Sequence, residues 1–205
     1  MEESPLHRNT VTGGASTLTA DSARPRADAV RNRAKLLVAA RDAFAAGEGD
    51  VTFDALARRA GVGVGTLYRN FPDRQALVEA VYRTELDAVA ESAGELLDKH
   101  PADVALRRWF DRYTGFVATK KGMAEAFQQA VASGAVTAGE TRERIRSTID
   151  RFLLVGSATG ALRGDVLSDD VTVALLGAVL GTAADTDGKR RGRVLDLLVD
   201  GLRPR

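Results

Sequence analysis

A group of hydrogen-bonding side chains follows a glycine-rich turn in the first half of the chain. The turn is Gly61-Val-Gly-Val-Gly, and the side chains are those of Thr66, Tyr68, Arg69 and Asn70. Arginine suits guanine because its planar guanidinium group presents two donors side by side, and threonine can contact base edges or phosphates. Tyrosine can donate its hydroxyl group to a phosphate, and Val64 can press on a thymine methyl group. These residue types indicate contact with DNA.

Two short amphipathic helices must position this group. Thr52 suits the N-cap of the first, because its hydroxyl group can accept a hydrogen bond from an unpaired amide. That helix begins at Phe53 and closes at Gly61, where a left-handed residue commonly ends a helix. The second covers about residues 64–71 and buries Leu67 and the phenylalanine four positions later, so its polar side chains face outward. This pattern predicts a helix-turn-helix, whose second helix can enter a DNA major groove.

Two residues at helix starts suit phosphate binding. Asp73, after Pro72, is predicted to cap a further helix that carries Arg74 in its first turn. The amides there point outward, so Arg74 can hold a phosphate that fixes the register, and Thr52 can do the same one helix earlier. The predicted DNA-binding residues are therefore Thr52, Val64, Thr66, Tyr68, Arg69, Asn70 and Arg74. The alternative is that they are ordinary surface residues.

Residues 60–77 carry a recognisable block, Ala-Gly-Val-Gly-Val-Gly-Thr-Leu-Tyr-Arg-Asn-Phe-Pro-Asp-Arg-Gln-Ala-Leu. It resembles the signature of TetR/AcrR-type transcriptional regulators, and residues 34–47 look like the first helix of that family. The resemblance covers about residues 31–81. One departure is Gly63, where the family usually has a serine or threonine cap, and glycine there costs only a few tenths of a kcal/mol. The resemblance implies that the seven predicted residues line the DNA.

The resemblance also implies how such a protein is regulated. In the family, two C-terminal helices pair with their counterparts in a four-helix dimer interface. A small molecule in a cavity of the middle region tilts the long fourth helix and spreads the DNA-reading units. Here the dimer residues implied are Leu175, Leu176, Val179, Val194, Leu197 and Leu198, and the pocket residues are Trp109, Phe110, Tyr113, Phe116, Phe127 and Phe152. Both sets have an alternative role in the core of one protomer.

Helical spacing of apolar residues continues through the rest of the chain. Further helices are predicted over residues 28–46, 73–99, 102–119, 123–131, 140–163, 171–183 and 188–202. No stretch of the chain alternates polar and apolar residues as a strand would. The predicted fold class is therefore all-α, with about nine helices. Residues 1–23 are predicted to be a disordered tail. A three-helix DNA-binding domain is expected over residues 24–75, and a larger helical ligand-binding and dimerisation domain over residues 76–205.

Composition limits the class of protein and its location. The 205 residues are 44% hydrophobic, and residues 22–74 hold ten basic against six acidic residues, which weakly favours a nucleic-acid face. Cysteine is absent and the two histidines are isolated, so no metal or other cofactor is expected. The longest uncharged apolar run, residues 171–184, is about two-thirds of the roughly 20 residues that span a bilayer. We expect a cytoplasmic protein without a membrane partner.

The predicted function is transcriptional regulation by a homodimer. One recognition helix reads few base pairs, so two copies must bind a palindromic double-stranded operator. We expect a repressor that an unknown small-molecule effector releases. The alternative is a helical ligand- or protein-binding module without DNA binding, whose affinity for DNA would not fall steeply with salt. An enzyme is not expected, because the glycine turn follows a helix and lacks the spacing of a dinucleotide fingerprint, and neither His7 nor His100 has a partner.

Overall fold

The computed structural model describes residues 23–134, 136–185 and 187–204, which fold into nine helices without a strand. The helices are α1 (Ala23–Ala45), α2 (Phe53–Ala60), α3 (Val64–Asn70), α4 (Arg74–Lys99), α5 (Ala102–Gly122), α6 (Ala124–Ala132), α7 (Ala138–Thr159), α8 (Ser168–Gly181) and α9 (Lys189–Asp200). The all-α prediction is confirmed. The predicted tail lies outside the described residues except for Ala23, which begins α1.

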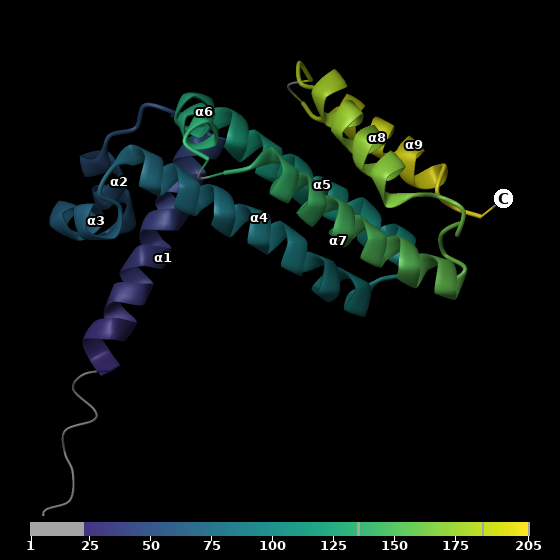
Figure 1. Cartoon of the computed structure of the whole chain (residues 1–205), viewed down its shortest axis with the longest axis horizontal. Helices are drawn as coiled ribbons and strands as arrows, with labels where there is room; N and C mark the ends of the chain where they lie inside the picture. The colour runs from purple at the N-terminus through teal and green to yellow at the C-terminus, as the bar shows by residue number, and fades with distance from the viewer. Residues whose placement is uncertain (1–22, 135, 186, 205) are drawn as a thin grey trace, which may run out of the picture.

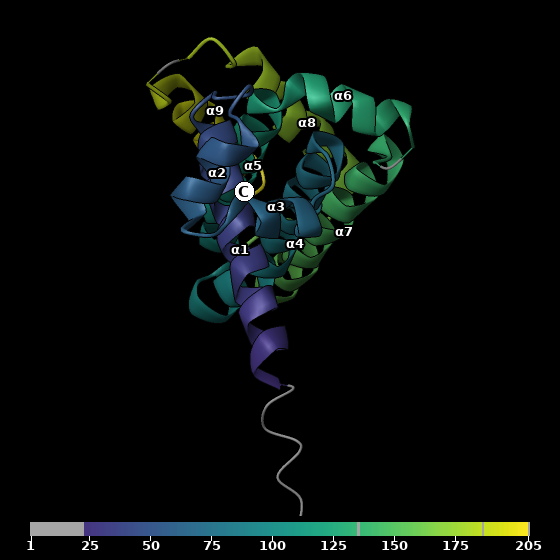
Figure 2. The same cartoon turned by 90° about the vertical axis from the view of Figure 1, so that its left-hand side faces the viewer.

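The helices form a small N-terminal unit and a longer body (Figure 1). The unit consists of α1, α2 and α3, and Figure 2 looks at that end of the molecule. The long helix α4 leaves α3 and packs along α5 and α7, while the short α6 lies against α4 near the unit. At the opposite edge, α8 packs on α7 and α9 packs on α5. The chain thus connects the unit to the body directly through α4.

One continuous apolar core joins the unit to the body. Leu36, Ala40 and Phe44 of α1 are buried in it together with Trp109 and Phe110 of α5. A unit of about 50 residues has only a marginal core of its own, so the packing of α1 on α5 supplies burial that the unit lacks. None of the described helices is long and apolar enough to cross a membrane.

Some helix ends differ from the sequence prediction, and each has a local cause. α7 ends at Gly160, which takes the left-handed conformation (φ 71°, ψ 12°), so the helix stops before residue 163. α8 begins at Ser168 with Leu167 as its N-cap. Asp169 and Asp170 therefore lie in its first turn, where their charges suit the positive helix end.

Candidate nucleic-acid interface

Caps at both ends of α2 set the direction in which the chain enters α3. Thr52 Oγ1 accepts a hydrogen bond from the Ala55 amide at 3.2 Å, so Thr52 is the N-cap that the sequence predicts. Gly61 is left-handed (φ 65°, ψ 36°), and its amide donates to the Arg58 carbonyl at 3.1 Å. Residues with a Cβ rarely adopt this conformation, so glycine is required at the turn.

α3 buries one side and exposes the other. Leu67 and Phe71 are buried in the core, as their four-residue spacing predicts. On the outer side Tyr68 is 54% exposed and Val64 is 39% exposed. The Tyr68 ring lies 5.2 Å from the Phe53 ring, measured between centroids. This contact holds the tyrosine in place and leaves more than half of its surface open to a partner.

Hydrogen bonds link three polar residues of α3 to one another. Arg69 donates from Nε to the Gly65 carbonyl and from Nη2 to Thr66 Oγ1, both at 3.1 Å. The side-chain amide of Asn70 donates to the Thr66 carbonyl at 2.8 Å. The guanidinium group is therefore held along an exposed side of α3. A fork of donors with a fixed direction is what recognition of a guanine edge requires.

Arg74 is oriented differently from these residues. Its partly buried side chain donates from Nη1 to the Val51 carbonyl at 2.9 Å, and its Cζ atom lies 5.9 Å from the centroid of the Phe44 ring. Nη2 is buried and has no hydrogen-bond partner among the described residues. The phosphate of Arg74 was predicted at the start of α4, and in the structure the side chain of Arg74 is turned from there to the Val51 carbonyl. Its guanidinium group instead supports the loop between α1 and α2.

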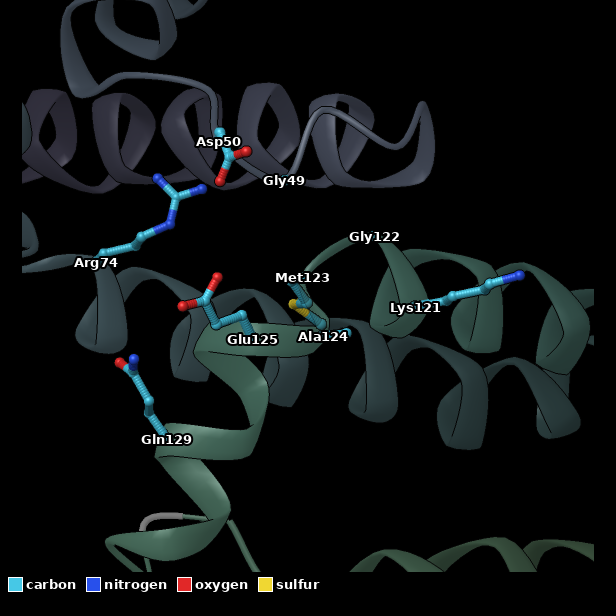
Figure 3. Close-up of a pocket in the computed structure, with 9 residues that line it drawn as sticks. All are labelled: Gly49, Asp50, Arg74, Lys121, Gly122, Met123, Ala124, Glu125 and Gln129. Atoms are coloured by element: carbon cyan, nitrogen blue, oxygen red, sulfur yellow. The ribbon is translucent and has the colours of Figure 1, made fainter.

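A cavity of about 500 Å³ lies beside Arg74 (Figure 3). Its walls come from the α1–α2 loop, the start of α4 and the junction of α5 with α6. In Figure 3 the Arg74 side chain points between the carboxylates of Asp50 and Glu125, whereas Lys121 points away. The cavity therefore marks the place where the N-terminal unit meets the body.

The aromatic residues predicted to line a ligand pocket divide into two groups. Trp109, Phe110, Phe116 and Phe152 are buried in the core away from the cavities, and Tyr113 is buried in the same core. Trp109 Nε1 donates to the Val89 carbonyl at 2.8 Å, which satisfies its one polar atom. These four do not line the second cavity described below, and a pocket role for them stays a prediction. Tyr113 and Phe127 line a second cavity, of about 320 Å³, between α4, α5, α6, α7 and α8.

Polar residues outside the sequence prediction complete this second cavity. They are Tyr82, Lys120, Thr141, Arg142 and Thr172. The hydroxyl groups of Tyr82 and Thr141 form a hydrogen bond. Burial raises the pKa of Tyr82 and of Tyr113, and it lowers the pKa of Lys120. One signal was available in the sequence: Lys120 follows Tyr113 by seven residues, or two helical turns, and so shares its side of α5.

The residues predicted at a dimer interface divide in a similar way. Leu175 and Val179 are buried within the protomer, so their role is corrected to the core. Val194 and Leu198 are partly buried. The exposed large apolar residues of α8 and α9 are Val173, Leu176, Leu180 and Leu197, which we call the α8–α9 apolar surface. Leu176 and Val173 also lie at the second cavity.

Comparisons with known protein families agree with this arrangement. Residues 36–81 match the model for bacterial regulatory proteins of the tetR family. Residues 101–204 match the C-terminal domain of SbtR-like transcriptional regulators. None of the curated proteins matches the chain.

Among the solved structures that are similar over most of the chain, two also share at least 33% of its sequence. A TetR transcriptional regulator from Streptomyces coelicolor is 42% identical, with a TM-score of 0.77 over 84% of this chain and 98% of that one. A TetR transcription regulatory protein from Mycobacterium vanbaalenii is 33% identical, with a TM-score of 0.70 over 88% of this chain and 99% of that one. The chain therefore belongs to the TetR family, and it is a DNA-binding transcriptional regulator and not an enzyme.

Proposed function

We propose that the chain is a homodimeric repressor that binds a palindromic operator through α3 and is released by a small molecule in the second cavity. The observation that carries this proposal is the exposed side of α3, where Gly65 and Thr66 hold the Arg69 guanidinium group. A side chain that is already oriented loses less conformational freedom when it binds. This arrangement favours recognition of a base edge over a loose phosphate contact.

Each residue of the interface has a proposed role that follows from its reach. Arg69 and Thr66 read base edges, and Val64 contacts a thymine methyl group. Tyr68 donates its hydroxyl group to a phosphate, and Thr52 holds a second phosphate at the start of α2. Asn70, which donates to the Thr66 carbonyl, positions the residues beside it.

The proposed dimer follows from the size of an operator. A single α3 contacts only a few base pairs, and two copies related by a twofold axis would lie roughly 34 Å apart, or a multiple of that distance. The α8–α9 apolar surface supports this assembly. Val173, Leu176 and Leu180 recur three and four positions apart on α8, so they share one side of it, and exposed apolar patches commonly mark an interface.

The proposed regulation uses α4 as the connection between ligand and DNA. Tyr82 of α4 lines the second cavity, and the same helix begins at Arg74, directly after α3 and the turn that follows it. A ligand that binds one orientation of α4 more tightly than another shifts the population of the two. Such a shift changes the distance between the two α3 helices of a dimer. A regulator of this kind acts on the chromosome and hence in the cytoplasm.

Footprinting on the DNA that flanks the gene of this protein tests the proposal. We expect two protected segments with related inverted sequences, and loss of protection when a metabolite extract is added. Uniform protection of unrelated DNA would contradict specific recognition. Protection that persists with every extract would contradict release by an effector.

A salt titration separates this function from that of a helical module without DNA binding. A groove binder must lose affinity steeply as salt rises, because it releases the counterions of the phosphates that it contacts. Affinity for the protected segment that is weak at low salt and independent of salt would favour the module.

A further inference from the structure

The second cavity combines apolar walls with one partly buried amino group. Phe127 and Ile145 supply apolar surface, and the exposed Val131, Val173 and Leu176 also line it. Lys120 enters the cavity from α5, and its Nζ atom lies 4.5 Å from the centroid of the Phe127 ring. A ligand in this cavity therefore meets mostly hydrocarbon and a single lysine.

The charge of Lys120 is not balanced by a carboxylate. Among the described residues none forms an ion pair with it, and no aspartate or glutamate lines the cavity. Burial lowers the pKa of Lys120, which shows that its surroundings disfavour the charged form. The face of the Phe127 ring stabilises the ammonium group in part, but a partly buried cation without a carboxylate still costs free energy, and an anion that enters the cavity would recover part of it.

The other cation of the cavity already has a partner. Arg142 is exposed, and its Nη2 atom lies 3.6 Å from a carboxylate oxygen of Asp169. Lys120 is therefore the group that lacks a negative charge. Ligands with a positive charge are disfavoured for the same reason, since nothing in the cavity wall would balance them.

Neutral hydroxyl groups accompany Lys120. The hydroxyl group of Tyr113 makes no hydrogen bond with the described residues, and that tyrosine lies two turns before Lys120 on the same side of α5. Burial raises the pKa of Tyr113, so its hydroxyl group keeps its proton and remains a donor at neutral pH. The Tyr82 hydroxyl group already donates to Thr141 Oγ1, because Thr141 donates its own proton to the Thr137 carbonyl. The free phenol donor of Tyr113, in the same cavity as the Lys120 ammonium group, suits the oxygen atoms of an acid.

We propose that the second cavity binds an amphipathic organic anion, with its acidic group at Lys120 and its apolar body against Phe127, Ile145 and Leu176. This inference rests on the proposed effector role of the cavity and names the chemical class of the effector. The acid is of the carboxylate or sulfonate type, and the body is a hydrocarbon chain or an aromatic ring system.

A matched pair of fluorescent probes tests the inference. Anilinonaphthalene sulfonate and N-phenylnaphthylamine share one aromatic skeleton, but only the first carries an acidic group. We expect the full-length protein to bind the sulfonate at least about tenfold more tightly, as measured by fluorescence titration. Lys120→Met should abolish this preference and leave the affinity for the neutral probe unchanged, and Lys120→Arg should restore part of the preference.

The neighbouring lysine provides the control. Lys121 is exposed and lies at the cavity beside Arg74, so Lys121→Met removes the same charge without touching the second cavity. We expect it to bind both probes like the parent protein. Equal affinity for the two probes, binding of neither, a preference that survives Lys120→Met, or equal losses in both lysine variants would each overturn the inference.

A DNA-binding measurement separates the test of the ligand class from the test of the proposed function. The fluorescence anisotropy of a labelled operator is measured with and without the sulfonate. A preference that depends on Lys120, without any change in DNA affinity, would support the ligand class and contradict the effector role. If the sulfonate releases the parent protein from the operator but does not release Lys120→Met, the result would support both the ligand class and the effector role.

Discussion

The backbone of Gly122, at the end of α5, lies directly against the carbonyl group of Phe44 in α1. A Cβ atom at residue 122 would lie 1.7 Å from the Phe44 oxygen and 2.6 Å from its carbonyl carbon. Gly49, in the loop after α1, makes a similar approach, since a Cβ there would lie 2.7 Å from the Gly122 oxygen. Two backbone segments thus meet where the N-terminal unit joins the body, beside the cavity that contains Arg74.

Gly122→Ala should therefore destabilise the protein. Backbone atoms cannot rotate away as a side chain can, so α1 and the end of α5 must separate, and we expect a loss of about 1–3 kcal/mol in the free energy of unfolding. Chemical denaturation measures it. Gly115→Ala in the same helix is the control, because no atom lies within 4 Å of its added Cβ. That variant should gain about 0.5–1 kcal/mol, and equal effects of the two changes would contradict the close contact.

Arg74→Met tests whether Arg74 supports the loop or binds a phosphate. The variant loses the hydrogen bond to the Val51 carbonyl, and we expect about 1–2 kcal/mol less stability from a charged donor of this kind. The slope of log affinity for DNA against log salt concentration should stay the same, because no counterion-releasing contact is lost. A slope reduced by about 1 would show instead that Arg74 contacts a phosphate.

The sequence predicted α2 and α3 well because both depend on local physics. Thr52, Gly61 and the spacing of Leu67 and Phe71 act within a few residues of one another, so a short stretch specifies caps, turn and buried side. The spacing of apolar residues shows which side of a helix is buried, but it does not show whether the same chain or a second protomer covers that side. Leu175 and Val179 were predicted to face a second protomer, and they are buried by their own chain.

The second cavity was harder to predict than α2 and α3, because its walls come from distant parts of the chain. Tyr82 meets Thr141 across 59 positions, and no local pattern encodes that pairing. The family resemblance implied that Trp109 and Phe152 line a pocket, and in the structure their rings pack on each other in the core, where the Val89 carbonyl accepts the hydrogen bond of the Trp109 indole. Long-range packing decides between core and cavity.

Arg69→Ala should relax recognition of one base pair. The loss of a two-donor contact with guanine costs roughly 1–3 kcal/mol at that position and much less on unrelated DNA. Arg69→Lys keeps the charge without the planar fork, so it should retain non-specific affinity and lose the same discrimination. Competition between the operator and single-base variants measures the effect. Equal losses on operator and random DNA would contradict a base contact.

The stability of the protein should depend on the titration of Lys120. Burial lowers the pKa of Lys120 in the folded protein below the 10.5 of the unfolded chain. At a pH between these two pKa values, the folded protein is neutral at this residue while the unfolded chain still binds the proton. The free energy of unfolding therefore rises with pH between these two pKa values. At lower pH Lys120 is charged in both states, and the folded state bears the full cost of the desolvated charge. Lys120→Met should be more stable than the parent at neutral pH, with an advantage that shrinks toward pH 10.5.

Denaturation at several pH values gives this difference between the two proteins. Tyr82, Tyr113 and Arg142 also line the cavity, but all three are present in both proteins and their effects cancel to first order. Burial raises the pKa of both tyrosines, which moves their titration further from neutral pH. A difference that does not change with pH would contradict a lowered pKa at Lys120.

Leu197→Glu should separate the proposed dimer without unfolding the protomer. Leu197 is 70% exposed, so a charge there should change the stability of one protomer by no more than about 0.5 kcal/mol. In a dimer built on the α8–α9 apolar surface the same charge would be buried without a partner, which opposes association. Sedimentation measures the oligomeric state. Val30→Glu is the control, because Val30 is also 70% exposed but lies on α1, and it should leave the dimer intact. If Leu197→Glu remains a dimer as well, the interface lies elsewhere and the two α3 helices are not paired through α8 and α9.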